Sequence, residues 1–363
     1  MPSLTSLPLE MLGEVGKHLQ VEDLKSCSLT CKALEAETRK QLFRKLSFVG
    51  TRSAMAEVLM KFLANVNQSR TQGMSRACRS LQIEVLPTDI DPFHECRNLL
   101  PALILSAKRN LPRVTTLSLA LHGLSKTEMS SLYRMVKETP SWDSVTILMS
   151  DLRPATLSNL LRHSMVNVRT IDVIPSMGRH EIASIKENCP GVQKLRVNFK
   201  YPFNDFLKHL RGGLRVKINQ LENLSQLVIQ ERGPAETFPI GGMHHPGDIP
   251  FRLSLIADQL GAMTNLRQIS LEIHPRVMTW ILPTNRLIPG HQLRADLDTF
   301  VMRAIVAMGT TLPHLEEICL VERSAEFNGI NLIHCGVRDS NGAMAVTIEA
   351  PGDENDFPLN VSR

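Results

Sequence analysis

Aromatic side chains are scarce in this chain of 363 residues, where Phe, Tyr and Trp together make up 4% of the sequence. This scarcity favours aliphatic cores built from helices and short strands. The chain also has no run of about 18 apolar residues, the length that a membrane-spanning helix needs. Its N-terminus lacks the basic start and long apolar stretch of a secretory signal. The sequence therefore predicts a soluble intracellular protein, in the cytoplasm or the nucleus, with no membrane partner.

Cysteine is sparse as well, with seven residues that follow no repeated spacing. An odd number of scattered cysteines in apolar segments is typical of reduced, mostly buried thiols in a reducing compartment. The positions are Cys27, Cys31, Cys78, Cys96, Cys189, Cys319 and Cys335. Glycosylation at the Asn-x-Ser triplets is not expected, because it requires secretion.

The chain also has no large excess of positive or negative charge. The formal net charge is +5, and no basic stripe or interleaving of basic and aromatic residues occurs. Such a stripe is the usual footprint of a nucleic-acid-binding protein. We therefore expect no nucleic-acid partner.

Patterns for catalysis and for metal binding are absent too. Neither the pair His94 and Cys96 nor the pair His244 and His245 has further ligands at zinc spacing. The Gly-Gly pairs lack the Lys-Ser/Thr of a phosphate loop, and no Ser, His and acid set stands on an elbow-like turn. The sequence predicts a protein that is not an enzyme and that needs no cofactor or metal.

What the sequence does contain is a leucine-anchored helical string in its first fifty residues. Pro8 suits the first turn of a helix, and Leu12, Val15 and Leu19 then recur on one helical face. Asp23 is predicted to cap a second helix, whose apolar positions are Leu24, Cys27, Cys31 and Leu34. A module this small has a marginal core, so it would gain stability by burying its spare apolar residues against a partner.

The order of these residues resembles the F-box family. The family pattern is Leu-Pro-x-Glu, apolar positions, an Asp-Leu pair, a small-Cys-Lys/Arg step and a closing aromatic-Leu. The matches are Leu7, Pro8, Glu10, Leu12, Val15, Leu19, Asp23, Leu24, Leu29, Cys31, Lys32, Phe43 and Leu46. Leu34 and Phe43 stand where many members carry Trp, as is common in fungal members. The resemblance covers residues 4–48; the alternative is an ordinary helical hairpin.

An F-box implies docking on the Skp adaptor of SCF ubiquitin ligases and, through it, on cullin and RING subunits. The resemblance carries over six positions as apolar contacts or as supports for them: Leu7, Pro8, Leu12, Val15, Leu19 and Leu24. Glu10 is placed to stabilise the first helical turn through the helix dipole. Gly16 is a weak point of the first helix, costing about 1 kcal/mol relative to Ala.

A second pattern recurs behind this module: four apolar residues separated by three, three and two positions. Copies begin at Leu111, Met165, Cys189, Leu221, Met263 and Leu312, with weaker versions at Cys78 and Trp142. We call this pattern the apolar phrase. Its final alternation is strand-like, and amphipathic helical stretches lie between copies. Strand–helix units at intervals of roughly 20–50 residues indicate a leucine-rich-repeat-like solenoid.

The solenoid is predicted to be irregular. Leucine-rich repeats place an Asn or Cys ladder after the strand, and this chain has other residues there: His122, Ser176, Lys200, Arg232, His274 and Arg323. A compact α/β domain with coincidental phrasing remains the alternative. Near the C-terminus, turn residues 339–342 between two apolar strands predict a β-hairpin that caps the last repeat.

Two interruptions of the repeats, residues 232–250 and 274–291, are rich in Gly and Pro or contain Trp. Insertions in a repeat array often form loops on the binding face. We hypothesise that these loops hold a client protein, with candidate residues His244, His245, Arg276 and Trp280. The alternative is that both are tolerated insertions.

The sequence thus predicts the α/β class, with a small all-α F-box, an irregular leucine-rich-repeat-like solenoid and a hairpin cap. The predicted parts are an F-box at 1–48, a connecting helical segment at 49–70, a substrate-recognition region at 71–350 and an acidic, disordered tail at 351–363. The expected function is that of a non-catalytic receptor presenting an unknown client within an SCF complex. Alternatives are a Skp-binding scaffold outside a cullin ligase, or an enzyme with a pocket in the solenoid.

Overall fold

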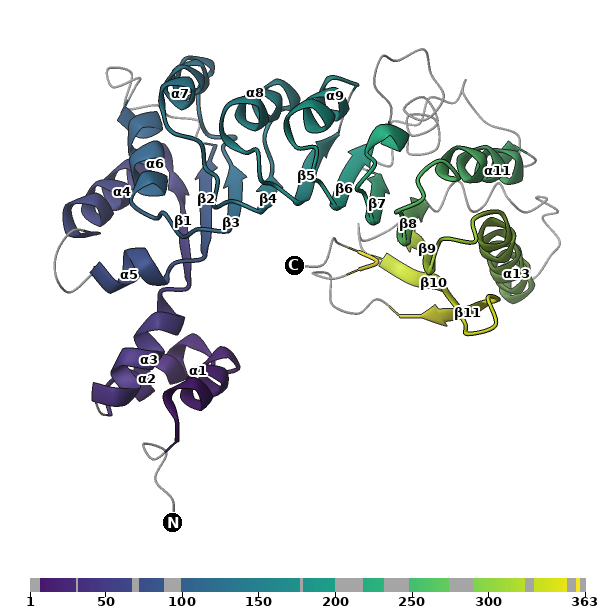
Figure 1. Cartoon of the computed structure of the whole chain (residues 1–363), viewed down its shortest axis with the longest axis horizontal. Helices are drawn as coiled ribbons and strands as arrows, with labels where there is room; N and C mark the ends of the chain where they lie inside the picture. The colour runs from purple at the N-terminus through teal and green to yellow at the C-terminus, as the bar shows by residue number, and fades with distance from the viewer. Residues whose placement is uncertain are drawn as a thin grey trace. The chain divides into compact units, whose positions relative to one another are not determined.

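The computed structural model of the chain divides into two compact units (Figure 1). The first comprises Met1–Leu152 and His163–Asn167, and the second comprises Arg153–Arg162 and Val168–Arg363. The structure describes residues 7–30, 32–66, 72–87, 99–176, 179–199, 218–231, 248–273, 290–323, 330–350 and 357–359. Within these ranges, no helix combines the length and apolar character needed to cross a membrane.

The first unit opens with a module of three short helices: α1 (Leu9–Lys17), α2 (Val21–Ser28) and α3 (Lys32–Leu42). Both α1 and α2 pack against α3, and Leu12, Leu24 and Leu34 are the buried leucines of the module. Glu10 in the first turn of α1 and Lys17 in its last turn complement the helix dipole.

Three details of these helices differ from the sequence predictions. Pro8 is the N-cap residue of α1 and stands just before its first turn. The predicted cap of the second helix is wrong, because α2 starts after Gln20 and contains Asp23 within its first turn. Leu34 belongs to α3, since α2 already ends at Ser28. The helices are thus shorter and more numerous than the leucine spacing indicates.

Four strands follow in the first unit: β1 (Lys45–Thr51), β2 (Ser80–Leu86), β3 (Thr116–Ala120) and β4 (Ile147–Ser150). Each pairs in parallel with the next one along the chain. Between them lie α4 (Arg52–Val66), α5 (Gln72–Ala77), α6 (Leu99–Arg109) and α7 (Lys126–Glu138). The sheet therefore begins inside the segment expected to be the helical module, and α4 occupies most of the expected connecting segment.

The second unit continues the same alternation. Its strands are β5 (Thr170–Ser176), β6 (Lys194–Phe199), β7 (Gln226–Glu231), β8 (Gln268–Ile273), β9 (Glu317–Arg323), β10 (Ile330–Arg338) and β11 (Met344–Glu349). Strands β5 to β9 pair in parallel in chain order, and the last two pairs are antiparallel. The helical elements are α8 (Pro154–Ser164), which crosses the unit boundary, α9 (Arg179–Asn188), η2 (Ile218–Gln220), α11 (Asp248–Leu260) and α13 (Gly290–Thr311). Pairing in chain order is what stacked repeats require.

The apolar phrase corresponds to a backbone turn that leads into strands β3, β4, β6, β7, β8 and β9. The N–H of its second apolar residue donates to the carbonyl of its first, as Val192 does to Cys189 at 3.1 Å and Leu266 to Met263 at 2.9 Å. The next two apolar residues, such as Leu195 and Val197 in β6, are buried on one face of the strand. The predicted repeat units are therefore confirmed at the level of strand and turn.

An asparagine ladder exists, but in the turn before the strand. Three Asn side chains, each two residues after the first apolar residue of its phrase, donate to a backbone carbonyl of the preceding repeat. The pairs are Asn167 with Asp143 at 3.0 Å, Asn223 with Pro190 at 2.9 Å, and Asn265 with Glu222 at 2.8 Å. These bonds tie consecutive repeats together at the start of their strands.

The predicted C-terminal hairpin is confirmed as β10 and β11. Asp339 accepts the backbone N–H groups of Asn341 and Ala343, and Gly342 supplies the positive φ of 83° that the turn needs. The tail expected to be disordered contains three packed residues, 357–359. Leu359 is buried, and its carbonyl accepts a bond of 2.7 Å from the side chain of Gln230 on β7.

Candidate interaction surfaces

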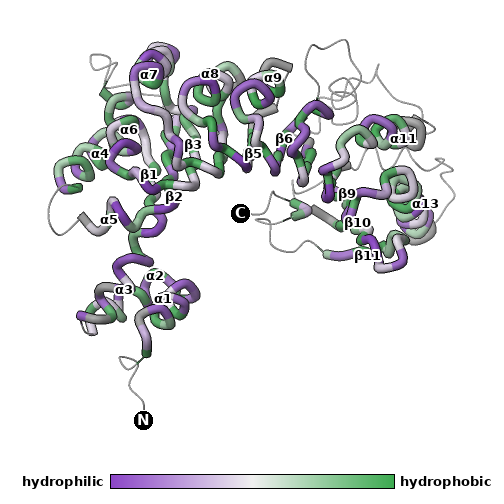
Figure 2. The backbone as a smooth tube through the Cα atoms, viewed as in Figure 1, coloured by the Kyte–Doolittle hydropathy of each residue, from purple (hydrophilic) through white to green (hydrophobic). Residues whose placement is uncertain are grey.

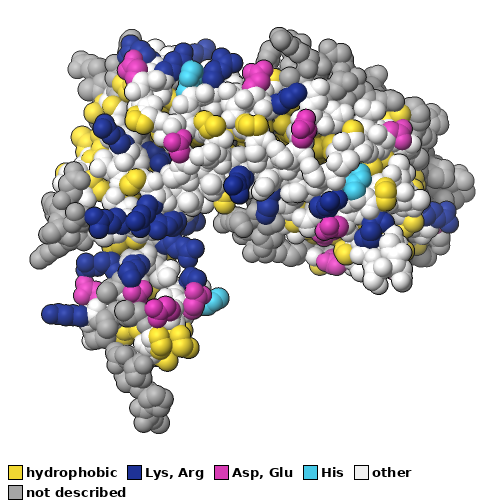
Figure 3. Space-filling view, viewed as in Figure 1, with side chains coloured by type: hydrophobic (Ala, Val, Ile, Leu, Met, Phe, Trp, Pro, Cys, Tyr) yellow, Lys and Arg dark blue, Asp and Glu magenta, His cyan; other side chains and the backbone are white. Residues whose placement is uncertain are grey.

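The N-terminal module exposes more apolar surface than its size requires. Figure 2 shows hydrophobic and hydrophilic residues interspersed along α1, α2 and α3, and Figure 3 shows hydrophobic side chains gathered at one end of the module. Four large apolar residues are exposed: Met11 by 52%, Val15 by 44%, Val21 by 51% and Leu29 by 87%. We call these four residues the apolar set. Exposed apolar residues in such a group commonly mark an interaction site.

The six positions carried over from the F-box resemblance fall into three classes. Leu12 and Leu24 are buried, where they support the helices. Leu7 and Leu19 are half-buried, and Pro8 and Val15 are exposed. Only some of the six can therefore touch a partner directly while the module stays folded.

The apolar set contains three residues that the sequence argument did not select as contacts: Met11, Val21 and Leu29. Helical periodicity places residues on faces, but it does not say which face a third helix covers. Here α3 packs against the face of α1 that carries Leu12 and Gly16. A Cβ at Gly16 would lie 3.2 Å from Cγ of Gln41 on α3 and 3.7 Å from Cδ2 of Leu24. Leu29 was already one of the family matches, so a signal for it was present in the sequence.

The four candidate client-binding residues cannot be placed. His244, His245, Arg276 and Trp280 all lie outside the residues that the structure describes, as do His94 and Cys96. The hypothesis that residues 232–250 and 274–291 hold a client therefore stays a prediction.

The sheet of the first unit offers an accessible polar face. Strand register aligns Ser47, Gln82, Ser118 and Met149 in one row across β1 to β4. Ser47 is exposed and the other three are half-buried. The hydroxyl of Ser47 donates to Oε1 of Gln82 at 3.2 Å. We call this row of Ser47, Gln82, Ser118 and Met149 the open sheet face.

The corresponding face in the second unit is covered. Register aligns Asp172, Arg196, Val228, Ser270, Cys319 and Cys335 across β5 to β10. All of these are buried except Arg196, which is half-buried. Part of the cover is the C-terminal segment, since Phe357 and Leu359 pack on the cluster that contains Cys319 and Cys335. The two units therefore differ in how much of their sheet is free for a partner.

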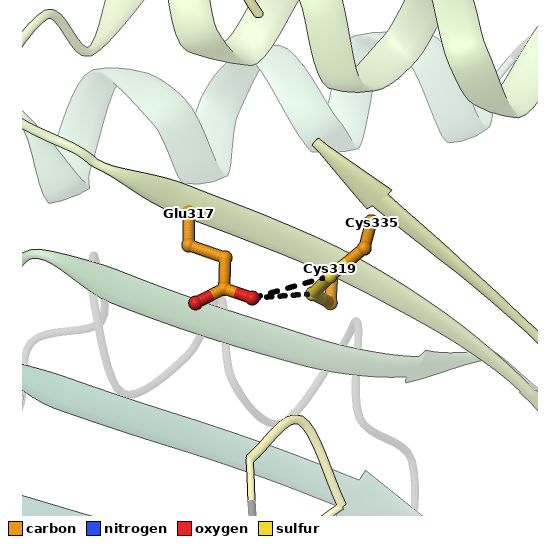
Figure 4. Close-up of side chains that lie close together, drawn as sticks. All are labelled: Glu317, Cys319 and Cys335. Atoms are coloured by element: carbon orange, nitrogen blue, oxygen red, sulfur yellow. Dashed lines mark hydrogen bonds between the residues drawn. A yellow bond between two sulfur atoms is a disulfide. The ribbon is translucent and has the colours of Figure 1, made fainter. Parts of the chain in front are cut away.

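One group of side chains on the covered face has metal-ligand character. Oε1 of Glu317 lies 3.4 Å from Sγ of Cys335 and 3.8 Å from Sγ of Cys319 (Figure 4). The two sulfurs are joined as a disulfide, which departs from the expectation that all the cysteines are reduced. Burial raises the pKa of Glu317, and the charge of Glu349 raises it further, while a hydrogen bond from Gln268 opposes the rise.

A partly buried polar network ties α13 to the face of the sheet opposite the cysteines. Nε2 of His334 lies 2.9 Å from Oδ1 of Asp298, and Arg294 bonds both Asp298 and Glu322 at 2.6 Å. Burial opposes ionisation of Asp298, but hydrogen bonds from Arg294 and His334 hold its pKa below the ordinary value. The paired imidazole and carboxylate resemble the His–Asp pair of a catalytic triad.

A shallow cleft of about 350 Å³ lies between the end of α6 and residues 139–144. Its lining includes Lys108, Trp142 and several Ser and Thr residues. The Lys108 ammonium sits 5.9 Å from the centre of the Trp142 ring, and burial lowers its pKa. If the chain were an enzyme, this cleft would be the candidate site for a small ligand.

Comparisons with known proteins assign no family. No family model matches the chain, and no curated protein matches it. One solved structure that the chain matches is that of a leucine-rich repeat-containing protein, LegL7, from Legionella pneumophila. It is 11% identical, with a TM-score of 0.40, over 78% of this chain and 84% of that one. These values are too low to support an argument, so the repeat architecture rests on this chain's own strand order and register.

Proposed function

We propose that this chain is the non-catalytic substrate-recognition subunit of an SCF-type ubiquitin ligase. Its N-terminal module docks on the Skp adaptor, and its repeats present a client protein. The observation that carries the proposal is the exposed apolar set on a module whose buried leucines, among the side chains that the structure describes, are Leu12, Leu24 and Leu34. The ordered F-box matches, from Leu7 to Leu46, support the Skp adaptor as the partner that we propose.

The contribution of such a receptor to the reaction is proximity. Holding a client lysine near a ubiquitin thioester raises its effective concentration without any catalytic residue from the receptor. The open sheet face is our first candidate for client binding, because its hydroxyl and amide side chains are accessible on a rigid support. The loops that contain His244, His245, Arg276 and Trp280 are the second candidate.

The test is affinity capture of the full chain with proteasome activity blocked, comparing wild type with Val15→Glu and Leu29→Glu. A carboxylate in a buried apolar interface is strongly unfavourable, so both variants should lose the adaptor and cullin. Val58 on α4 is also an exposed valine, at 45%, and Val58→Glu is the matched control that should keep both. Client proteins should remain with all three variants.

The outcomes separate the proposal from its rivals. An adaptor that is absent from wild-type captures overturns the proposal. Capture of the adaptor without cullin or RING subunits supports the scaffold alternative. Equal loss with Val58→Glu would show that added charge disturbs the fold rather than the docking surface.

A further inference from the structure

Cys319, Cys335 and Glu317 converge because of the sheet geometry at the end of the second unit. Cys319 on β9 and Cys335 on β10 are directly opposite in antiparallel register, with their Cα atoms 4.3 Å apart. Glu317 precedes Cys319 by two residues, so it points to the same side of β9. That side faces away from α13, since His334, the neighbour of Cys335, bonds to Asp298 on α13.

The distances from the Glu317 carboxylate to the two sulfurs suit a tetrahedral cation, and the two sulfurs, which are bonded to each other in the disulfide, separate when it is reduced. One sulfur from each cysteine and a carboxylate oxygen of Glu317 all lie within 4.8 Å of one another. A zinc ion with usual Zn–S and Zn–O bonds at a tetrahedral angle would place sulfur and oxygen about 3.6 Å apart. The observed distances from Oε1 of Glu317 to the two sulfurs, 3.4 and 3.8 Å, lie on either side of that value.

The carboxylate is already oriented for this role. Nε2 of Gln268 on β8 donates to Oε2 of Glu317 at 2.7 Å, which leaves Oε1 turned toward the sulfurs (Figure 4). A hydrogen bond that fixes a ligand in this way is characteristic of metal sites. Val321, Ile333 and Leu359 pack around the cysteines, so the site is shielded by apolar side chains that strengthen electrostatic binding.

We propose that the dithiol form of the protein binds one thiophilic divalent cation, of the zinc class, through Cys319, Cys335 and Glu317. Binding replaces the two thiol protons, which are released to water, with two sulfur–metal bonds. Solvent reaches the half-buried Glu317, and a water molecule supplies the fourth ligand. The disulfide form cannot bind the ion in this way, because its sulfurs are bonded to each other. The metal-bound form and the disulfide form therefore exclude one another.

The test uses the full-length protein, reduced with a phosphine that is then removed, and cobalt(II) as the probe. We expect about one equivalent of cobalt, with a sulfur-to-metal charge-transfer band and the visible bands of a tetrahedral ion, and zinc should displace it. Cys335→Ser should abolish the charge-transfer band. Glu317→Gln should weaken binding by about tenfold or more.

Two controls keep the test independent of folding defects. Cys189→Ser removes a buried cysteine far along the chain, whose thiol pKa burial raises to about 12, and it should leave cobalt binding unchanged. The oxidised wild-type chain carries no substitution and should bind no cobalt. The proposal fails if the reduced protein binds no cobalt, if the oxidised protein binds equally well, or if Cys189→Ser removes the signal.

Discussion

Asp298 is the central residue of the network that holds α13 on the sheet. It accepts a hydrogen bond from Arg294 and pairs with the fully buried His334. Without it, the imidazole of His334 would lose its one recorded partner among the described residues. Buried polar groups left unpaired cost free energy, so this residue should matter for stability rather than for chemistry.

The stability that Asp298 provides should depend on pH. Its pKa in the folded protein lies below the ordinary value of 3.8, so the folded state favours the ionised form. The stabilisation is fully present when the pH is above the ordinary pKa of Asp298. It is lost as the pH falls through the lowered pKa of the folded state. We expect Asp298→Asn to reduce the free energy of unfolding by about 1–3 kcal/mol at neutral pH.

Urea unfolding of wild type and Asp298→Asn at pH 7 and at pH 3 measures this dependence. The difference between the two proteins should shrink at pH 3, where protonation of Asp298 begins to mimic the substitution. Asp258, which is exposed on α11, provides the Asp→Asn control. A constant difference at both pH values would show that the charge of Asp298 does not contribute.

Single residues also show where sequence reasoning stops. Gly16 reads as a weak point in a helix, but its missing side chain lets α1 approach Gln41 and Leu24 closely. Asp23 has a good capping side chain, yet α2 begins earlier, at Val21. The close packing at Gly16 depends on tertiary contacts, which local propensity does not contain.

At the scale of elements, the apolar phrase predicted the strands well. Its spacing carries the physical requirement: two apolar residues in the turn and two on the inner face of the strand. The sequence has no Asn or Cys ladder after its strands, and the Asn bonds in the turns before the strands were not predicted, because they cross between repeats. Asn223 and Pro190, for example, are 33 residues apart, and no local pattern reports such a pairing.

The ladder should contribute to stability, although its side chains lie at the surface. We expect Asn223→Ala and Asn265→Ala each to lower the free energy of unfolding by about 1 kcal/mol. Asn159→Ala is the matched control, since Asn159 bonds a carbonyl of its own helix, that of Ala155. Urea unfolding checks the prediction. Equal losses in all three variants would mean that bonds between repeats have no special weight.

At the scale of the whole molecule, the described residues show one open sheet face and one covered sheet face. The alternation of apolar and polar residues predicts strands in both units, but it does not say what lies over them. The cover in the second unit includes Phe357 and Leu359, from a tail whose acidic, polar composition indicates no packing role. Long-range contacts of this kind could not be read from the sequence.

If the open sheet face binds the client, a large charged side chain there should block capture. We expect Ser118→Arg and Gln82→Arg to lose client proteins while keeping the adaptor, and Thr127→Arg on the exposed surface of α7 to keep both. Quantitative mass spectrometry of captured proteins measures the effect. An unchanged client list would redirect attention to residues 232–250 and 274–291, which separate deletions would then test.

The turn that precedes strands β3, β4, β6, β7, β8 and β9 has a consequence for how the sequences of such repeat proteins evolve. It constrains four apolar positions and, before β7 and β8, one asparagine; the helices between turns only need an apolar stripe and can vary in length. Any aliphatic residue satisfies most of these positions. Two descendants of one ancestor can therefore keep the same strand order and register while sharing very few identical residues.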